Sequence, residues 1–276
     1  WLDLLETRHP KAIDLGLERC REVWVRMGTP RPAPSVYVVA GTNGKGSSAA
    51  MLESTLDNVV DGNLTARGAV NMALYDIIGK ANDLPVHTLL GGRRHNKLPL
   101  LFGVGSGTPE ETIAVIQAQM ETGCRCFMIK MGALPIADEI KRVIAVQEQF
   151  GDQIRIIIDA NQGWDTITAI ETLKALEPYG IEHCEEPIPH WNNRELVKVR
   201  ENSPIPIMAD ESVFDHHDAF RLASMGACDY FNIKFSKSGG IYNALKITSI
   251  AEAAGIKCQV GCMSESRFAL TALMHL

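Results

Sequence analysis

Ionisable residues stand at the ends of several short apolar segments of this 276-residue sequence. In chain order they are a lysine, three acids and a second lysine, namely Lys130, Asp159, Glu185, Asp210 and Lys234. The intervals between them are roughly 25 to 30 residues, which is the length of one strand-helix unit. If each apolar segment is a parallel strand, all five side chains emerge at one rim of a barrel, where barrel enzymes carry their active sites.

Three carboxylates that meet at one rim repel each other unless a cation lies between them. An all-oxygen ligand set is typical of Mg²⁺, with Mn²⁺ as an alternative. We therefore expect Asp159, Glu185 and Asp210 to bind one divalent metal ion. The other interpretation is that each charge is an independent, solvated loop residue, and the regular spacing makes that interpretation the weaker one.

The two lysines indicate the kind of reaction. A proton next to a carboxylate leaves only if a metal stabilises the resulting enediolate and the base has a lowered pKa. A lysine close to a metal and to another cation meets the second requirement. If Lys130 and Lys234 lie on opposite sides of the substrate, one removes the proton and the other returns it to the opposite face. The expected reaction is a racemisation or an epimerisation.

The fold class predicted from this pattern is α/β. Short apolar strands alternate with amphipathic helices from residue 98 onward, which favours parallel βαβ units. Strands are predicted at 98–105, 126–131, 154–159, 181–186, 205–210, 230–235 and 256–260, and helices at 109–121, 136–150, 166–177, 193–200, 215–223 and 242–254. These about seven strands form an incomplete TIM-type barrel, because a closed one needs eight.

A short α/β segment with a glycine-rich turn precedes the barrel. An apolar strand at 36–40 runs into the turn, in which Gly44, Lys45, Gly46 and Ser47 could bind the phosphates of a nucleotide. Residues 1–56, and the run AGTNGKGS in particular, resemble the N-terminus of folylpolyglutamate synthases and Mur ligases. The resemblance implies ATP as a ligand if the turn is functional. The alternative is an isolated phosphate loop without activity.

We divide the chain into three parts: a P-loop-like segment at 1–57, a remnant helical cap at 58–97 and the barrel at 98–276. The cap contains a helical pattern within residues 66–92. The chain starts at Trp1 and stops at Leu276, so we expect both ends to be trimmed.

The composition of the chain limits the kinds of molecule that it is expected to bind. The formal net charge of -6 gives no basic face for nucleic acid or an anionic membrane, so a small molecule is the expected partner. The seven cysteines lie mostly in apolar runs, which is typical of reduced core residues and of a cytoplasmic protein. No apolar stretch reaches the length of a membrane helix. A homo-oligomer stays open.

The motifs at the rim are Ile157–Asn161, Glu185–Pro187, Ala209–Ser212 and Asn232–Lys234 followed by Ser238–Gly240. Together they resemble the muconate-lactonizing branch of the enolase superfamily. The resemblance implies metal ligation by Asp159, Glu185 and Asp210, with Lys130 and Lys234 as an opposed acid-base pair. Glu186 and Glu211 would be neighbours of the ligands.

Within that branch, residues 261–267 (GCMSESR) and the helix within 66–92 look most like dipeptide epimerases of the L-Ala-D/L-Glu type. This implies a dipeptide substrate, contacted by Asn161 and Glu265. Three departures from the family pattern keep alternatives open. Met128 replaces the first lysine of a Lys-x-Lys pair, the capping sheet is replaced by the synthase-like segment, and the chain ends before an eighth strand. The alternatives are a catalytically impaired chimera or fragment, a cycloisomerase or o-succinylbenzoate synthase, and an ATP-binding ligase remnant.

Overall fold

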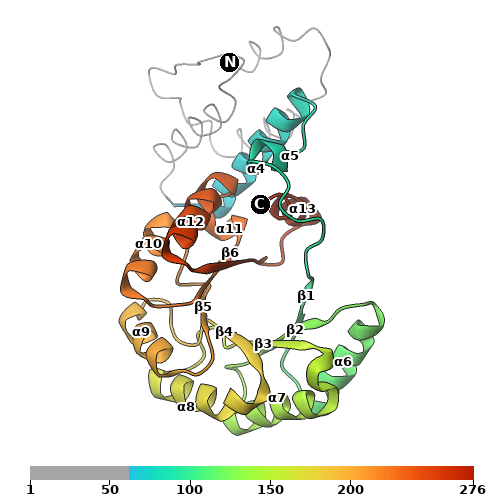
Figure 1. Cartoon of the computed structure of the whole chain (residues 1–276), viewed down its shortest axis with the longest axis vertical. Helices are drawn as coiled ribbons and strands as arrows, with labels where there is room; N and C mark the ends of the chain where they lie inside the picture. The colour runs from blue at the N-terminus through green and yellow to red at the C-terminus, as the bar shows by residue number, and fades with distance from the viewer. Residues whose placement is uncertain (1–61) are drawn as a thin grey trace.

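A single parallel sheet of seven strands, curled into an open barrel, organises the structure, which is a computed structural model that describes residues 62–276 (Figure 1). The strands follow one another around the barrel in chain order. Their bounds are β1 Leu101–Val104, β2 Cys126–Lys130, β3 Arg155–Asp159, β4 Ile181–Glu185, β5 Ile207–Ala209, β6 Tyr230–Ile233 and β7 Lys257–Val260. Seven parallel strands in sequential order confirm the predicted α/β, incomplete TIM-type fold.

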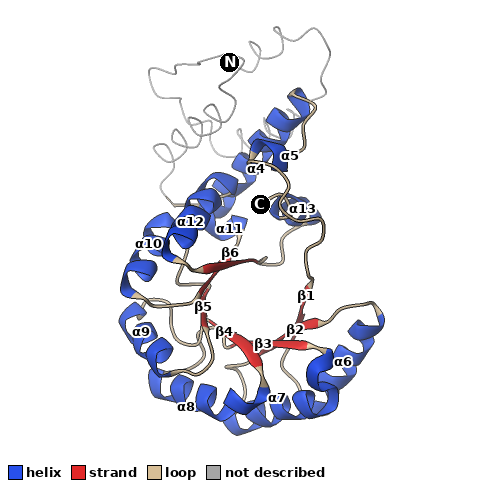
Figure 2. Ribbon diagram, viewed as in Figure 1, coloured by secondary structure: helices blue, strands red, loops and turns tan. Residues whose placement is uncertain are grey.

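Helices cover the outer face of the sheet (Figure 2). They are α6 Pro109–Glu121, α7 Ile136–Phe150, α8 Thr166–Leu176, α9 Asn193–Asn202, α10 His216–Met225 and α12 Ile241–Ala254. Four further helices are α4 Leu64–Ala81, α5 Val86–Leu89, α11 Phe235–Ser238 and α13 Arg267–Leu273, and two 3₁₀ turns span Gly151–Gln153 and Glu177–Tyr179. None of the helices between residues 62 and 276 combines the length and apolar character needed to cross a membrane.

Strand β2 shows how alternation decides which side chains reach the rim. Phe127 and Ile129 are fully buried in the main core between the sheet and its helices. Cys126 and Met128 point to the other face and pack with Ile157 of β3 inside the barrel. Because side chains alternate along a strand, Lys130 shares the inner face with Met128 and stands at its open end. Charged residues are tolerated there because the rim is polar.

Side-chain caps define the start of several helices. Thr108 and Glu111 form a reciprocal capping box at α6, and Pro109 occupies the first turn. Asp165 accepts a hydrogen bond from the Thr168 amide at α8. Asp215 accepts bonds from the His217 and Asp218 amides at α10, so the neighbouring histidine pair begins a helix.

The cap helix α4 packs against α11 and α12. Thr65 Oγ1 donates to the Ser236 carbonyl at 3.0 Å, and the Ile241 amide donates to Asn71 Oδ1 at 2.8 Å. These bonds tie α4 to the turn that follows β6. Residues before the barrel therefore support the same rim that carries Lys234.

Some elements differ from the sequence prediction. Helices α6 and α7 have the predicted bounds, whereas β5 is shorter than 205–210. Pro204 and Pro206 lack amide donors and cannot extend the ladder. Helices α11 and α13 were not predicted, because four and seven residues are too few to display a helical period.

Strands β1 and β7 are the two ends of the sheet, and within the described residues they do not pair with each other. Strand β7 is largely exposed, in contrast to the buried strands β2 and β3. The barrel is therefore open between its first and last strands (Figure 2).

Candidate active site

The five rim residues predicted from the spacing come together at the carboxyl ends of consecutive strands. Lys130, Asp159 and Glu185 are the last residues of β2, β3 and β4. Lys130 pairs in register with Asp159, and Asp159 with Glu185. Asp210 and Lys234 directly follow β5 and β6. The carboxylates lie on the three strands between the two lysine-bearing strands.

The three carboxylates are buried, each with an exposed fraction of 1% or less. Burial raises the pKa of Asp159, although the neighbouring Lys130 ammonium opposes this effect. Burial, reinforced by the charges of Asp159 and Asp210, also raises the pKa of Glu185 well above its usual value. Three neighbouring carboxylic acids that are buried from solvent cannot all ionise without compensating positive charge.

Lys130 provides part of this compensation. Its ammonium group donates to Asp159 Oδ2 and, at 2.9 Å, to Asn161 Oδ1. Asn161 has a left-handed backbone with φ of 42°, and its own amide donates to Asp159 Oδ1 at 2.8 Å. Asn161 Nδ2 also donates to Glu211 Oε1 at 3.3 Å. The structure thus places Asn161 between the lysine and the loop that follows β5.

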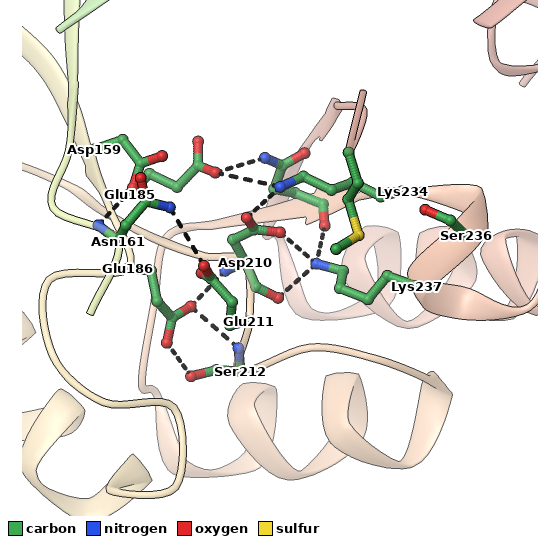
Figure 3. A network of polar contacts seen from close by, with 12 residues as sticks. Asp159, Asn161, Glu185, Glu186, Asp210, Glu211, Ser212, Lys234, Ser236 and Lys237 are labelled. Atoms are coloured by element: carbon green, nitrogen blue, oxygen red, sulfur yellow. Dashed lines mark hydrogen bonds and ion pairs between the residues drawn. The ribbon is translucent and has the colours of Figure 1, made fainter. Parts of the chain in front are cut away.

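Lys234 faces the other end of the acid cluster (Figure 3). Its ammonium group donates to Asp210 Oδ2 and lies 3.9 Å from Glu185 Oε1. Burial lowers the pKa of Lys234, but the charges of Asp210 and Glu185 outweigh this, so the net direction is upward. Asn232 of β6 completes this side by donating to Glu185 Oε1 at 2.8 Å.

A third lysine belongs to the cluster and was missed by the sequence analysis. Lys237 of α11 is 3% exposed, and its ammonium group donates to Asp210 Oδ1 at 2.6 Å and to the Asn232 carbonyl at 2.9 Å. Burial alone would raise the pKa of Asp210, but Lys237 and Lys234 hold it below its usual value. The only sequence signal was the spacing of three residues from Lys234.

Glu186 braces the loop that carries Asp210. Its backbone is left-handed with φ of 34°, and its buried Oε2 accepts from the amides of Asp210 at 2.6 Å and Ser212 at 3.1 Å (Figure 3). Ser212 Oγ donates to the other carboxylate oxygen. Burial raises the pKa of Glu186 to about 7. Glu186 therefore lies beside the acid cluster while its carboxylate is engaged with the loop.

Glu265 lies in the loop after β7. Its carboxylate accepts from Ser236 Oγ and from the Met263 amide. Ser236 stands two residues after Lys234, so Glu265 links the loops that follow β6 and β7. The role of Glu265 at the site stays a prediction.

The turns after β2 and β3 touch through two glycines. Gly132 has φ of +85°, and a Cβ there would lie 2.2 Å from the Ala160 carbonyl oxygen. A Cβ on Gly163 would lie 2.6 Å from Gly132 Cα. Only residues without side chains fit this contact. It holds the turn after Lys130 against the turn after Asp159.

The acid cluster offers oxygen ligands for a divalent cation, but lysines occupy part of it. Between residues 62 and 276, no three acidic, histidine or cysteine side chains are grouped so that they could bind one metal ion. Lysine ammonium groups bond instead to Asp159 and Asp210. Glu185 Oε2, however, is buried without a hydrogen-bond partner among the described residues. An unpaired buried oxygen amid carboxylates fits a hard cation such as Mg²⁺, provided that the ammonium groups move aside.

Met128, which stands where the family pattern has a lysine, is buried in the barrel interior and carries no charge toward Lys130. The glycine-rich turn with Gly44, Lys45, Gly46 and Ser47 lies outside the described residues.

Two family models match the chain. Residues 111–276 match the model "Enolase C-terminal domain-like", and residues 43–91 match the N-terminal domain of mandelate racemase / muconate lactonizing enzyme. An L-Ala-D/L-Glu epimerase of Clostridium acetobutylicum is 43% identical over 223 residues, covering 80% of this chain and 62% of the relative. Muconate cycloisomerase 1 of Pseudomonas putida is 39% identical over 229 residues, covering 83% of this chain and 60% of that protein.

Solved structures give the same picture. A dipeptide epimerase from Cytophaga hutchinsonii, complexed with Mg and the dipeptide D-Ala-L-Val, matches with a TM-score of 0.80 at 39% identity, covering 85% of this chain and 63% of that one. The muconate lactonizing enzyme from Pseudomonas putida matches with a TM-score of 0.82 at 34% identity, covering 92% and 70%. The chain spans about three fifths of the length of these curated relatives. The chain belongs to the mandelate racemase / muconate lactonizing enzyme family of the enolase superfamily.

Proposed function

We propose that this chain is a metal-dependent epimerase that removes and returns the proton next to a carboxylate, with a dipeptide as its substrate. One observation carries the proposal: two lysines, Lys130 and Lys234, flank three buried carboxylates at one rim of the barrel. A two-base reaction needs this arrangement, because the proton leaves one face of a planar intermediate and arrives at the other.

The relatives support a dipeptide. Their names include L-Ala-D/L-Glu epimerase and D-Ala-D/L-Ala epimerase, at 43% and 41% identity. The related structure from Cytophaga hutchinsonii holds Mg and D-Ala-L-Val. We carry over the class of substrate, a dipeptide, and Mg²⁺ as the cation, with Mn²⁺ as the alternative that hard oxygen ligands would also accept.

Asp159, Glu185 and Asp210 are the residues that would hold the cation. When bound, it would stabilise the negative charge that develops on the substrate carboxylate as the α-proton leaves. Glu186 and Lys237 hold Asp210 from two sides, through its backbone amide and its Oδ1 atom. The β5 loop is therefore positioned before any ligand arrives.

Lys130 and Lys234 would exchange the proton. The lysine facing the α-hydrogen acts in its neutral form, takes the proton and becomes an ammonium group. The opposite lysine starts as an ammonium group and donates a proton to the other face of the same carbon. With no cation between the carboxylates, the charges of Asp210 and Glu185 raise the pKa of Lys234. The reverse reaction exchanges the two roles.

Asn161 and Glu265 are the proposed substrate contacts. Asn161 lies beside Lys130 at the exposed part of the rim. Glu265 lies beside Ser236 on the side of Lys234. The two residues come from different ends of the acid cluster, so a molecule that contacted both would span it.

The test is incubation of the chain with Mg²⁺ and a library of L,L-dipeptides in D₂O. Deuterium at an α-carbon, detected by mass spectrometry and NMR, is the expected result. Lys130→Ala and Lys234→Ala serve as matched controls, since each removes one amine. Absence of deuterium with every dipeptide, while the wild type binds Mg²⁺ by calorimetry, would overturn the epimerase and favour a catalytically impaired chimera or fragment.

A cycloisomerase is the second candidate, because muconate cycloisomerase 1 is 39% identical and two muconate-type structures match closely. Lys130 or Lys234 could then donate or accept the proton that is transferred when the ring closes or opens. Loss of the ultraviolet absorption of muconate, without α-deuteration of dipeptides, would favour this candidate. An o-succinylbenzoate synthase reaction belongs to the same group and is tested by its own substrate.

Two expectations stay predictions. The turn at Gly44–Ser47 would bind ATP if residues 1–57 work as in folylpolyglutamate synthases, and nucleotide binding that disappears in Lys45→Ala would support a ligase remnant. Assembly into a homo-oligomer is open to measurement by light scattering.

A further inference from the structure

A buried pair of charged residues lies on α7, the helix that follows β2. Arg142 and Glu139 are each fully buried, and Arg142 is the largest completely buried side chain of the described residues. The two residues are three positions apart and therefore share a helix face. Neither residue has a role in the proton transfer proposed above.

Within the described part of the chain, the side chains of this pair form their hydrogen bonds with the backbone at two strand ends. Arg142 Nη2 donates to the Lys130 carbonyl, and Nη1 donates to the Gly105 carbonyl at 3.1 Å. Glu139 accepts from three successive amides after β2, those of Gly132 at 2.9 Å, Ala133 at 3.0 Å and Leu134 at 2.9 Å. The pair thus forms hydrogen bonds with the backbone at Lys130 and in the turn that follows it.

Packing alone does not explain these residues. Burying an ion costs several kcal/mol, and apolar side chains of similar volume often serve a core as well or better. Arg142 Nε even lacks a hydrogen-bond partner within the described part of the chain, which adds to the cost. The compensation is a set of charge-assisted bonds to the backbone, one at Gly105 after β1 and the others at residues 130–134.

The backbone of the opposite lysine is held by the turn that follows it, including Ser238 Oγ, rather than by side chains of a covering helix. Lys234 is followed at once by α11, whose Lys237 and Ser238 amides donate to the Lys234 carbonyl. The side chain of Lys234 is about a third as exposed as that of Lys130, at 13% against 38%. Lys130, which is open to solvent, needs its backbone fixed because its own side-chain contacts constrain it less.

We propose that Arg142 and Glu139 are positioning residues for Lys130, holding the end of β2 so that this amine alone keeps its place against the substrate. The proposal rests on the epimerase function proposed above. Its consequence is asymmetric: weakening the pair impairs proton transfer at one face of the substrate and spares the other.

The experiment uses Arg142→Met, which keeps volume and removes the donors, and Glu139→Gln, a milder change that keeps one acceptor oxygen. Deuterium incorporation in D₂O is measured separately from each of the two epimers. The epimer served by Lys130 is defined as the one whose exchange Lys130→Ala abolishes. Arg142→Met is expected to slow that exchange by about 10²-fold, the cost of an error of about 1 Å in placement. Exchange from the other epimer should stay near the wild-type rate.

Arg200→Met is the matched control. Arg200 is also a helix arginine, but it bonds to Asp229 and to the Gly226 carbonyl, before β6, at the opposite end of the barrel. A general loss of stability would slow both epimers in Arg200→Met and Arg142→Met alike. Equal slowing of both epimers in Arg142→Met, or no slowing in either, would overturn the proposal. Glu139→Gln decides the matter in the same way if Arg142→Met does not fold.

Amide hydrogen exchange separates this proposal from the proposed function. In Arg142→Met, faster exchange at 130–134 with unchanged exchange at 232–236 is expected, and this readout requires no turnover. If the wild type deuterates no dipeptide, the epimerase proposal fails. The positioning of Lys130 is then supported by the localised change in amide exchange or overturned by its absence.

Discussion

The two lysine-bearing ends of the rim achieve the same placement by different means. Lys130 is 38% exposed and contacts one carboxylate and one amide, while α7 fixes its backbone. Lys234 is 13% exposed, lies against two carboxylates and has a second, buried ammonium group beside it. One amine is therefore positioned through its peptide group and the other through the charges around its side chain.

The difference matters because a two-base reaction treats both faces of the substrate with similar groups. Equivalent chemistry does not require equivalent surroundings, provided that each amine is held within reach. Substitutions at the β2 end and at the β6 end should thus differ in their effects on proton exchange from each epimer and on the free energy of unfolding.

Removing either amine has the largest expected effect. Lys130→Ala and Lys234→Ala should each lower epimerisation by about 10³-fold, since one proton transfer loses its acid-base group. Each variant should still exchange the α-proton of one epimer, and the two variants should retain opposite epimers. Deuterium incorporation from each epimer measures this. Lys198→Ala, at an exposed surface lysine paired with Glu195, is the control that should match the wild type. Two variants that retain the same epimer would refute the opposed arrangement.

Replacing Asp210 or Asp159 with asparagine should lower the stability of the fold by different amounts. Asp210→Asn leaves the buried Lys237 ammonium without its charged partner, so we expect a loss of about 3 to 5 kcal/mol. Asp159→Asn frees only Lys130, which can turn to solvent, and should cost about 1 kcal/mol or less. The pKa directions agree, because the folded state favours ionised Asp210 and protonated Asp159.

Urea unfolding of both aspartate variants in metal-free buffer gives the two free energies. The comparison fails if Asp159→Asn is as damaging as Asp210→Asn. In that case both carboxylates would be held by equally buried partners, contrary to the exposure of the two lysines.

A smaller loss is expected from the support of the β5 loop. Glu186→Ala leaves the Asp210 and Ser212 amides without an acceptor and should destabilise the fold by about 2 kcal/mol. Glu186→Gln keeps an acceptor oxygen and should cost less. Thermal unfolding orders the two variants. Exchange from the epimer served by Lys234 should fall further in Glu186→Ala than in Glu186→Gln. An effect confined to the other epimer would contradict a role of the loop after β5 on the side of Lys234.

The smallest effect concerns a site remote from both lysines. Asp215→Ala removes the cap that binds the His217 and Asp218 amides at the start of α10, at a cost of about 1 kcal/mol. Chemical denaturation should show this loss, while deuterium exchange from both epimers stays at the wild-type rate. A change in either exchange rate would mean that α10 influences the rim.

The spacing of charged residues predicted the rim because each strand and helix of a barrel repeats a similar length. It located Lys130, Asp159, Glu185, Asp210 and Lys234 correctly at strand ends. The amphipathic pattern, which spans several turns in each case, predicted the bounds of α6 and α7. Periodicity therefore suffices where an element is long and its position in the repeat is regular.

Lys237, Glu139 and Arg142 could not be identified in this way. Lys237 lies in a helix of four residues, and a lysine in so short a segment is usually exposed. Glu139 and Arg142 look like the polar face of an amphipathic helix, yet both are buried against the chain after β2. Their partners are backbone groups, which leave no trace in the residue types of the sequence.

The contact between Gly132 and Gly163 restricts where this barrel can vary. Because the turns after β2 and β3 meet backbone to backbone, neither can accept a longer or bulkier segment without separating Lys130 from Asp159. Variation in the molecules that such a rim admits must then come from the loops after the later strands, where Trp191 and Met263 are exposed. Libraries meant to alter selectivity should leave the turns after β2 and β3 unchanged and diversify the loops after the later strands.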